Sequence, residues 1–66
     1  MQATINGESH QLPEGLTVAA LLVHLGLKAE RVAVERNGAV VKRAQHAEAR
    51  LAQDDVLEIV SFVGGG

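Results

Sequence analysis

The last three residues of the sequence are the ones whose type and spacing best suit a chemical role. Gly64, Gly65 and Gly66 follow one another directly, and a backbone without Cβ atoms has the smallest cross-section that a polypeptide can have. Three extended residues reach about 10 Å, so they would carry the carboxylate of Gly66 into the active site of another protein. A frayed chain end without a function is the alternative. We expect residues 64–66 to form a flexible tail.

Other groups point less directly to chemistry. His10, His24 and His46 lie too far apart along the chain for a metal-ligand motif. We therefore expect three exposed or helix-end histidines and no metal site. Asp54 and Asp55 could serve as paired carboxylates in acid–base catalysis. Adjacent acids directly before a strand are more typical of a solvated turn, and we favour that interpretation.

The distribution of charge excludes some partners. The chain has six basic and eight acidic residues and a formal charge of -2, without a basic run. Phe62 is its only aromatic residue, so no stacking platform exists and nucleic-acid binding is not expected. Arg36, Lys42 and Arg43 group around a predicted hairpin. They would suit an acidic partner surface; the alternative is a surface that only keeps the protein in solution.

Periodicity and turn residues predict the elements that must position these groups. Alternation predicts strands over residues 2–6 and 8–12, joined at Gly7 and ended by Pro13. A helix is expected from residue 18 to residue 25, between an N-cap at Thr17 and a stop at Gly26. Its apolar face consists of Val18, Leu21, Leu22 and Leu25.

The second half of the chain predicts more strands. Residues 32–36 and 39–41 flank Asn37-Gly38, the strongest short hairpin signal. Residues 44–52 hold at most a short helical turn, and residues 56–63 form the longest strand. The order β-β-α-β-β-β predicts a small α+β roll, in which one helix covers one face of the sheet and the first and last strands pair near its centre.

Alternation in the last strand predicts a partner-binding surface. Leu57 and Ile59 suit the helix-covered face, so Glu58 and Val60 must point to the other face, together with Val56 and Phe62. Val60 and Phe62 are two large apolar groups next to the chain end, and this favours a contact surface for a partner. Val63 would extend that surface. The alternative is that they cover a sheet edge or lie exposed singly, as many apolar residues do.

Length and composition limit the organisation of the protein. Sixty-six residues correspond to one small domain, here expected over residues 1–63 with the tail at 64–66. Cysteine is absent and hydrophobic residues make up 47%, so the domain should fold by packing alone, without disulfides or thiolate chemistry. No apolar stretch is long enough to span a membrane and no signal peptide is apparent. We expect a cytoplasmic protein with no membrane partner.

Taken together, these features resemble one known family. The residues that carry the resemblance are 32–38 with Val40-Val41, 57–60, and the terminal Val63-Gly64-Gly65-Gly66. In this combination and at this length, the sequence resembles the ThiS-type sulfur carriers of thiamin biosynthesis. These are β-grasp, ubiquitin-like proteins and sisters of the small subunit of molybdopterin synthase. The sequence departs from the family pattern at Lys42, His46 and Asp54, where proline, tryptophan and glycine are common.

The resemblance implies a mechanism and partners. In the family an E1-like adenylyltransferase of the ThiF type uses ATP and magnesium to adenylate the terminal carboxylate, here that of Gly66. Sulfur that a donor such as a cysteine desulfurase supplies then replaces AMP, and the thiocarboxylate donates sulfur to a ThiG-type thiazole synthase. The carrier itself is a protein cosubstrate and not an enzyme, and it binds no cofactor of its own.

Two other functions stay open at this point. One is sulfur transfer for molybdopterin synthesis, although those carriers tend to be longer and to end in Gly-Gly without the Val-Gly-Gly-Gly form. The other is a ubiquitin-like modifier or a non-covalent interaction module. The sequence does not name the sulfur donor or the stoichiometry of any complex.

Overall fold

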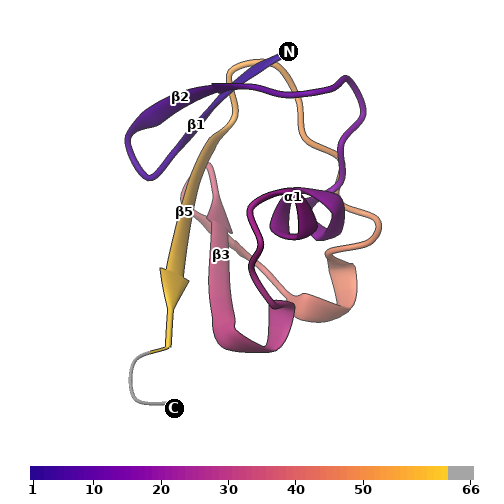
Figure 1. Ribbon diagram of the computed structural model, residues 1–66, viewed down its shortest axis with the longest axis vertical. Helices are drawn as coiled ribbons and strands as arrows, with labels where there is room; N and C mark the ends of the chain where they lie inside the picture. Colours follow the sequence, from indigo (N-terminus) through magenta and orange to yellow (C-terminus); the bar gives the residue numbers. More distant parts are fainter. Residues whose placement is uncertain (63–66) are drawn as a thin grey trace.

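The structure, a computed structural model, describes residues 1–62, which form a five-stranded sheet with one α-helix on one of its faces (Figure 1). Along the chain the elements are β1 (Gln2–Ile5), β2 (Glu8–Gln11), α1 (Val18–His24), the 3-10 helix η1 (Ala29–Arg31), β3 (Val32–Arg36), β4 (Ala39–Val41), the 3-10 helix η2 (Arg43–Gln45) and β5 (Val56–Ser61). The predicted strands and helix are confirmed, except that the last strand ends at Ser61. The helix η1 was not predicted, and η2 begins one residue before the predicted helical segment.

Both hairpins turn at an Asn-Gly pair. Asn6 and Gly7 have φ angles of 50° and 82°, and Asn37 and Gly38 have φ angles of 52° and 87°. Two consecutive left-handed residues match the right-handed twist of the strands that they join, and asparagine and glycine adopt that conformation at the lowest cost. The first hairpin therefore has the same kind of Asn-Gly turn as the second, although only the second pair was interpreted as a hairpin signal in the sequence.

The helix α1 is capped by Thr17 at its start and by Gly26 after its end, as the sequence predicts. The hydroxyl of Thr17 accepts a hydrogen bond of 3.1 Å from the backbone N–H of Ala20. At the other end Gly26 has a φ of 73°, its N–H donates to the carbonyl of Val23, and that of Leu27 donates to the carbonyl of Leu22. This is the Schellman arrangement, and it satisfies carbonyls that the last turn leaves without partners.

The strand β5 lies at the centre of the sheet, which has the order β2-β1-β5-β3-β4. It pairs in parallel with β1 and antiparallel with β3, so it joins the two hairpins into one sheet. The last strand of the chain and the first one are therefore neighbours near the centre, as the order of elements predicts.

The core lies between the sheet and α1. Leu21 and Val18 of the helix and Leu57 of β5 are completely buried. Seven residues are too short for a stable isolated helix, so α1 depends on this contact. The core consists of Ala3, Ile5, Leu12, Val18, Leu21, Leu22, Val32, Val34, Leu51, Leu57 and Ile59. A bilayer-spanning helix is absent from residues 1–62, where none combines the length and the apolar character that crossing requires.

Candidate functional site

The face of the sheet opposite α1 exposes the residues that alternation assigned to it. Leu57 and Ile59 of β5 are buried beneath the helix, whereas Val56 is 47% exposed and Val60 is 60% exposed. Glu58, between them on the same face, is exposed as well. The central strand of the sheet thus presents two valines and one carboxylate to the outside, and we call this side the open face.

Neighbouring strands extend the open face. In the register of the sheet Ala33 lies opposite Val60, and Glu35 lies between Glu58 on one side and Val40 on the other. Val40 is 67% exposed. Two carboxylates that face each other across an antiparallel pair repel one another, so the open face combines exposed apolar groups with an electrostatic arrangement that does not stabilise the fold.

Phe62 lies just beyond β5, at the point where the described part of the chain stops. Its backbone N–H donates a 2.9 Å hydrogen bond to the carbonyl of Arg31, and its side chain is 58% exposed. The prediction placed Phe62 in the last strand beside Val60. In the structure the strand ends at Ser61, and Phe62 contacts the segment that connects α1 to β3.

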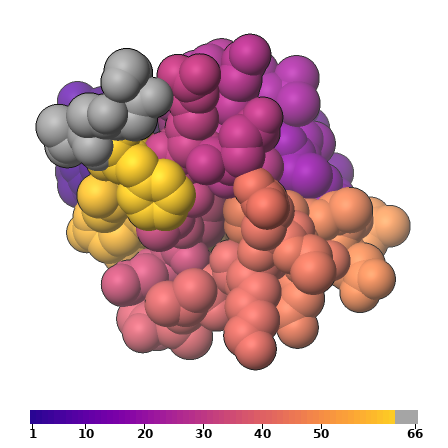
Figure 2. Space-filling model, turned by 90° about the horizontal axis from the view of Figure 1, so that it is seen from below, coloured from indigo at the N-terminus to yellow at the C-terminus, as the bar shows by residue number. Residues whose placement is uncertain are grey.

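Two pockets meet at Phe62. One, of about 420 Å³, is lined by Gly26, Leu27, Lys28, Arg31, Val32, Ser61 and Phe62. The other, of about 290 Å³, is lined by Ala29, Glu30, Val32, Arg43 and Phe62. Figure 2 looks onto this end of the molecule, where the yellow end of the β5 segment lies between the magenta connection to β3 and the salmon segment around η2. The predicted site residues Val63, Gly64, Gly65 and Gly66 lie outside the described residues.

The basic residues predicted to group around the second hairpin do not act together. Arg36 points to the turn before β5: its Nε lies 3.5 Å from Oδ2 of Asp55 and its Nη1 donates a 2.9 Å bond to the carbonyl of Arg50. Arg43 instead lines a pocket at Phe62, and Lys42 is exposed. The structure therefore assigns Arg36 to the fold and Arg43 to the surface near the chain end.

The interpretation of both acids as a solvated turn is half wrong. Asp54 is exposed and has a φ of 70°, a left-handed conformation that glycine adopts at the lowest cost. Asp55, however, is buried, with 6% of its surface exposed. Its carboxylate accepts hydrogen bonds from the backbone N–H of Ala52 at 2.8 Å and from Nδ2 of Asn37 at 3.0 Å. Asp55 therefore organises the turn and contacts the second hairpin.

The expectation of three exposed or helix-end histidines is met only by His24. His24 ends α1 and is exposed, and His10 is half-buried, but His46 is only 4% exposed. Its Nε2 lies 3.1 Å from the carbonyl oxygen of Val41, so Nε2 carries the proton and donates it. Its own carbonyl accepts from the N–H of Ala19 at 2.9 Å. His46 thus ties the segment after β4 to α1.

Two asparagines also hold the sheet together: Asn6, which was predicted as the last residue of the first strand, and Asn37, which was predicted as a turn residue. Oδ1 of Asn6 accepts from the N–H of Ile59 at 2.7 Å, and its Nδ2 donates to the carbonyl of Ile59 at 3.0 Å. Oδ1 of Asn37 accepts from the N–H of Val56 at 2.9 Å. Each hairpin turn is thereby fastened to β5. The repeated Asn-Gly pair was the signal that could have indicated this role.

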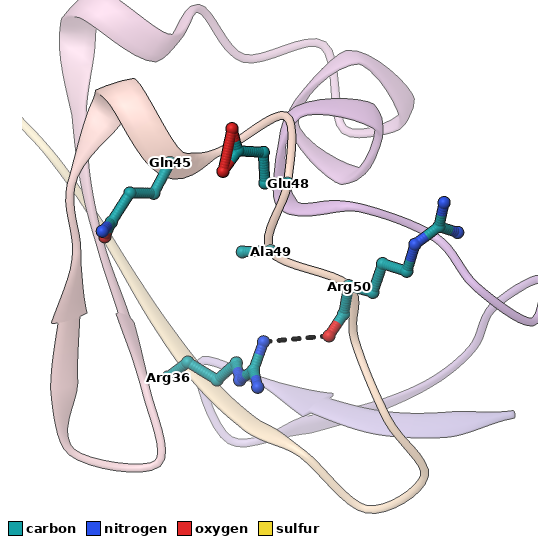
Figure 3. Close-up of a pocket in the computed structure, with 5 residues that line it drawn as sticks. All are labelled: Arg36, Gln45, Glu48, Ala49 and Arg50. Carbon is teal, nitrogen blue, oxygen red and sulfur yellow. Dashed lines mark hydrogen bonds between the residues drawn. The ribbon is translucent and has the colours of Figure 1, made fainter.

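A third pocket, of about 360 Å³, is lined by Arg36, Gln45, Glu48, Ala49 and Arg50 and does not include Phe62 (Figure 3). Both arginines of this pocket already donate hydrogen bonds to backbone carbonyls of the protein. The guanidinium of Arg36 points to the carbonyl of Arg50, while the side chain of Arg50 extends away and bonds the carbonyl of Gly15 at 3.3 Å. Within residues 1–62 no three histidine or acidic side chains gather as metal ligands.

The mixed sheet with a central last strand and a single covering helix defines a β-grasp protein. Apart from Val23 of α1, its exposed large apolar side chains lie on the open face and at Phe62. The chain belongs to the ThiS family, whose model matches residues 2–66. The members of this family are small sulfur carriers of thiamine biosynthesis. The family prediction and the fold prediction are both confirmed.

Individual relatives agree with this assignment. The crystal structure of the thiamine biosynthesis protein ThiS from Geobacter metallireducens superimposes with a TM-score of 0.86 at 36% identity, over 100% of both chains. The sulfur carrier protein ThiS of Bacillus subtilis is 42% identical over 50 residues, which are 76% of each chain. A thiazole synthase of Magnetococcus marinus is 47% identical over all 66 residues, but the chain spans only 20% of that relative's length. The same fraction holds for a thiazole synthase of Paramagnetospirillum magneticum.

Proposed function

We propose that the protein is a sulfur carrier in thiamine biosynthesis whose Gly66 carboxylate is adenylated, converted to a thiocarboxylate and used as the sulfur source for thiazole formation. The observation that carries this proposal is the extent of the family match, which runs to residue 66 and so includes the three glycines. Glycines without side chains suit the passage of a chain end into a narrow active site.

The chemistry requires activation before sulfur can be loaded. A carboxylate is a poor acyl donor, because its negative charge is delocalised over both oxygens and its carbon resists attack by a nucleophile. Attack of a Gly66 oxygen on the α-phosphorus of ATP releases pyrophosphate and leaves an acyl-adenylate, in which AMP is a good leaving group. Sulfur from a persulfide donor then forms the C–S bond as AMP departs. Reduction of the remaining S–S bond by a thiol releases the thiocarboxylate.

The carrier supplies recognition and its partners supply the catalysis. We assign the ATP and magnesium site to an E1-like adenylyltransferase of the ThiF type, and the sulfur to a donor such as a cysteine desulfurase. A ThiG-type thiazole synthase receives the sulfur. Two longer relatives named thiazole synthase contain a segment similar to this chain, which supports a thiazole synthase as the recipient. The carrier is then a protein cosubstrate and not an enzyme.

The docking surface for these partners consists, in this proposal, of Glu58 and Val60 on the open face and of Phe62 with Val63 at the chain end. Val60 and Phe62 are 60% and 58% exposed. Apolar side chains presented by a rigid central strand are suitable anchors, because a partner can bury them without reorganising the fold.

Intact-mass spectrometry tests the proposed function directly. The protein is incubated with a ThiF-type adenylyltransferase, ATP, magnesium, a cysteine desulfurase, cysteine and a thiol reductant. The expected product is heavier by the difference between one sulfur and one oxygen atom. A variant that lacks Gly65 and Gly66 should keep its fold and remain unmodified. A series of conjugates with other proteins would instead indicate a modifier, and an unchanged mass would contradict the carrier function.

A further inference from the structure

Basic side chains line both pockets that Phe62 borders. Lys28 and Arg31 line one pocket, and Arg43 lines the other. They come from two segments that are distant in sequence, the connection between α1 and β3 and the start of η2, which meet at this end of the molecule (Figure 2). We call Lys28, Arg31 and Arg43 the basic collar.

The collar is not needed by the fold. Arg36 and Arg50, the arginines away from this end, donate to backbone carbonyls, and Arg36 also pairs with Asp55. In contrast, the collar side chains form no hydrogen bond or ion pair with any residue in the range 1–62 and are exposed. Within residues 1–62, no side chain neutralises these three charges.

The collar also stands out against the charge of the whole chain. Three of the six basic residues line the two pockets, but only one of the eight acidic residues, Glu30, does so. This end is positive although the chain carries a formal charge of -2. An uneven distribution of charge of this kind orients the molecule as it approaches a charged partner.

We propose that the basic collar and Phe62 together form a docking surface for an acidic protein surface, namely a rim of aspartate and glutamate side chains around an apolar socket. The socket would receive the Phe62 ring, and the carboxylates would enter the pockets beside it. An aromatic anchor surrounded by arginines is the composition that protein interfaces favour. A small anion would use the charges but would leave the ring and the apolar lining from Leu27, Ala29 and Val32 without a partner.

The position of the collar identifies which partner meets it. Residue 63 follows Phe62 in the chain, so any protein that engages residues 63–66 approaches this end of the molecule. Resting on the proposed function, in which activation precedes sulfur loading, the inference assigns the acidic rim to the first partner that engages the chain end, at the entrance of the adenylyltransferase site that admits the glycine tail. The collar would steer the chain end toward that entrance and raise the association rate at low ionic strength.

Stopped-flow association with a ThiF-type adenylyltransferase at several salt concentrations tests the inference. The variants are Arg31→Gln, Arg43→Gln and the double substitution. The control is Gln11→Glu, which changes the net charge by the same amount as one collar substitution but lies at an exposed position of β2. Each collar substitution should lower the association rate constant at low salt by about 2-fold to 5-fold and should flatten its salt dependence. The control should behave as the wild-type protein.

Pyrophosphate exchange on the same preparations separates the inference from the proposed function. If the wild-type protein is activated and the collar variants associate at its rate with the same salt dependence, the collar has no docking role and the carrier function stands. Equal effects of Gln11→Glu and of the collar substitutions would also overturn the inference, because net charge alone would explain them. Lower melting temperatures of the collar variants would make the collar structural and overturn it as well. A wild-type protein that is never activated refutes both proposals.

Discussion

The Asp55 carboxylate contacts two separate parts of the chain, its own turn and the second hairpin. It accepts from Ala52 in its own turn and from Asn37 in the second hairpin, and it lies 3.5 Å from the guanidinium of Arg36. Because it is buried, each of these donors would lose its partner if the carboxylate were removed. The turn before β5 and the hairpin that follows β3 are therefore stabilised as one unit.

Asp55→Asn should lower the free energy of unfolding by about 2 kcal/mol, because an amide presents a donor where the carboxylate accepts and leaves Arg36 without its counter-charge. Urea denaturation measures the change. Asp54→Asn is the matched control: Asp54 is exposed, and asparagine also tolerates its left-handed conformation, so the change should stay below about 0.5 kcal/mol. Equal effects of the two substitutions would contradict the role assigned to Asp55.

The side chain of Asn6 makes two hydrogen bonds to the backbone of Ile59 in β5, one to its N–H and one to its carbonyl. In this way it acts on β5 as the backbone of a neighbouring strand would. Asn6→Asp keeps the acceptor but places a carboxylate oxygen against the Ile59 carbonyl. We expect a loss of about 1 to 3 kcal/mol of unfolding free energy, because that carbonyl loses its donor. Gln11→Glu, an amide-to-acid change at an exposed position, should have almost no effect. An Asn6→Asp protein as stable as the wild type would show that the Asn6 contact is dispensable.

Residue types alone could not separate Asp54 from Asp55, or His46 from His10 and His24. Adjacent acids are solvated unless donors converge on one of them, and here the donors come from Asn37 and Arg36, which are distant in sequence. His46 is buried because the segment after β4 folds back on α1, where its carbonyl meets the N–H of Ala19. Such long-range contacts leave no local pattern, whereas caps and turns do.

At the scale of the elements, the period of β5 predicted which of its residues are buried. Leu57 and Ile59 lie beneath α1 and Val56 and Val60 are exposed, since a strand alternates strictly. The prediction was wrong at the end of the strand. Pairing with β3 ends at Val32 opposite Ser61, so Phe62 continues beyond the ladder to the α1–β3 connection. The length of a strand depends on its neighbour, and hydrophobicity alone does not reveal it.

The carboxylates of Glu35 and Glu58, which lie opposite each other, offer a test of the open face. Glu58→Gln should raise the free energy of unfolding by a few tenths of a kcal/mol, about 0.2 to 0.5, because it removes a like-charge pair. Its affinity for the adenylyltransferase should fall if Glu58 contacts the partner. Urea denaturation and titration calorimetry give the two quantities. Glu48→Gln, at an exposed position outside the sheet, serves as the control; a Glu58→Gln protein with unchanged affinity removes Glu58 from the docking surface.

Val60 and Phe62 should contribute to partner binding more than to folding. We expect Val60→Ala and Phe62→Ala each to weaken affinity for the adenylyltransferase by about 10-fold to 100-fold, as apolar anchors at interfaces commonly do. Stability should fall by less than about 1 kcal/mol, since both side chains are more than half exposed. Isothermal titration and urea denaturation on the same preparations decide the matter. A large loss of stability with intact binding would place Phe62 in the core.

At the scale of the whole molecule, the proposal divides the protein into a folded body and a reacting chain end. Gly65→Val keeps the length of the chain and the Gly66 carboxylate but widens the backbone with a β-branched side chain. We expect it to abolish adenylation while the far-UV circular dichroism spectrum stays native and docking persists, so the variant should inhibit the wild-type protein competitively. Gly65→Ala should show a smaller effect in the same pyrophosphate-exchange assay. Adenylation of Gly65→Val at the wild-type rate would show that the chain end does not pass through a narrow channel of the partner.

The central position of β5 has a consequence for synthesis on the ribosome. Neither hairpin meets its central neighbour until residues 56–61 have been made, and two isolated hairpins are not stable in water. The nascent chain must therefore stay unfolded until β5 has emerged, and an interrupted translation product that lacks β5 has no route to the native state. Proteases would remove such fragments. The pool of folded carrier would then consist of molecules whose synthesis has passed residue 61.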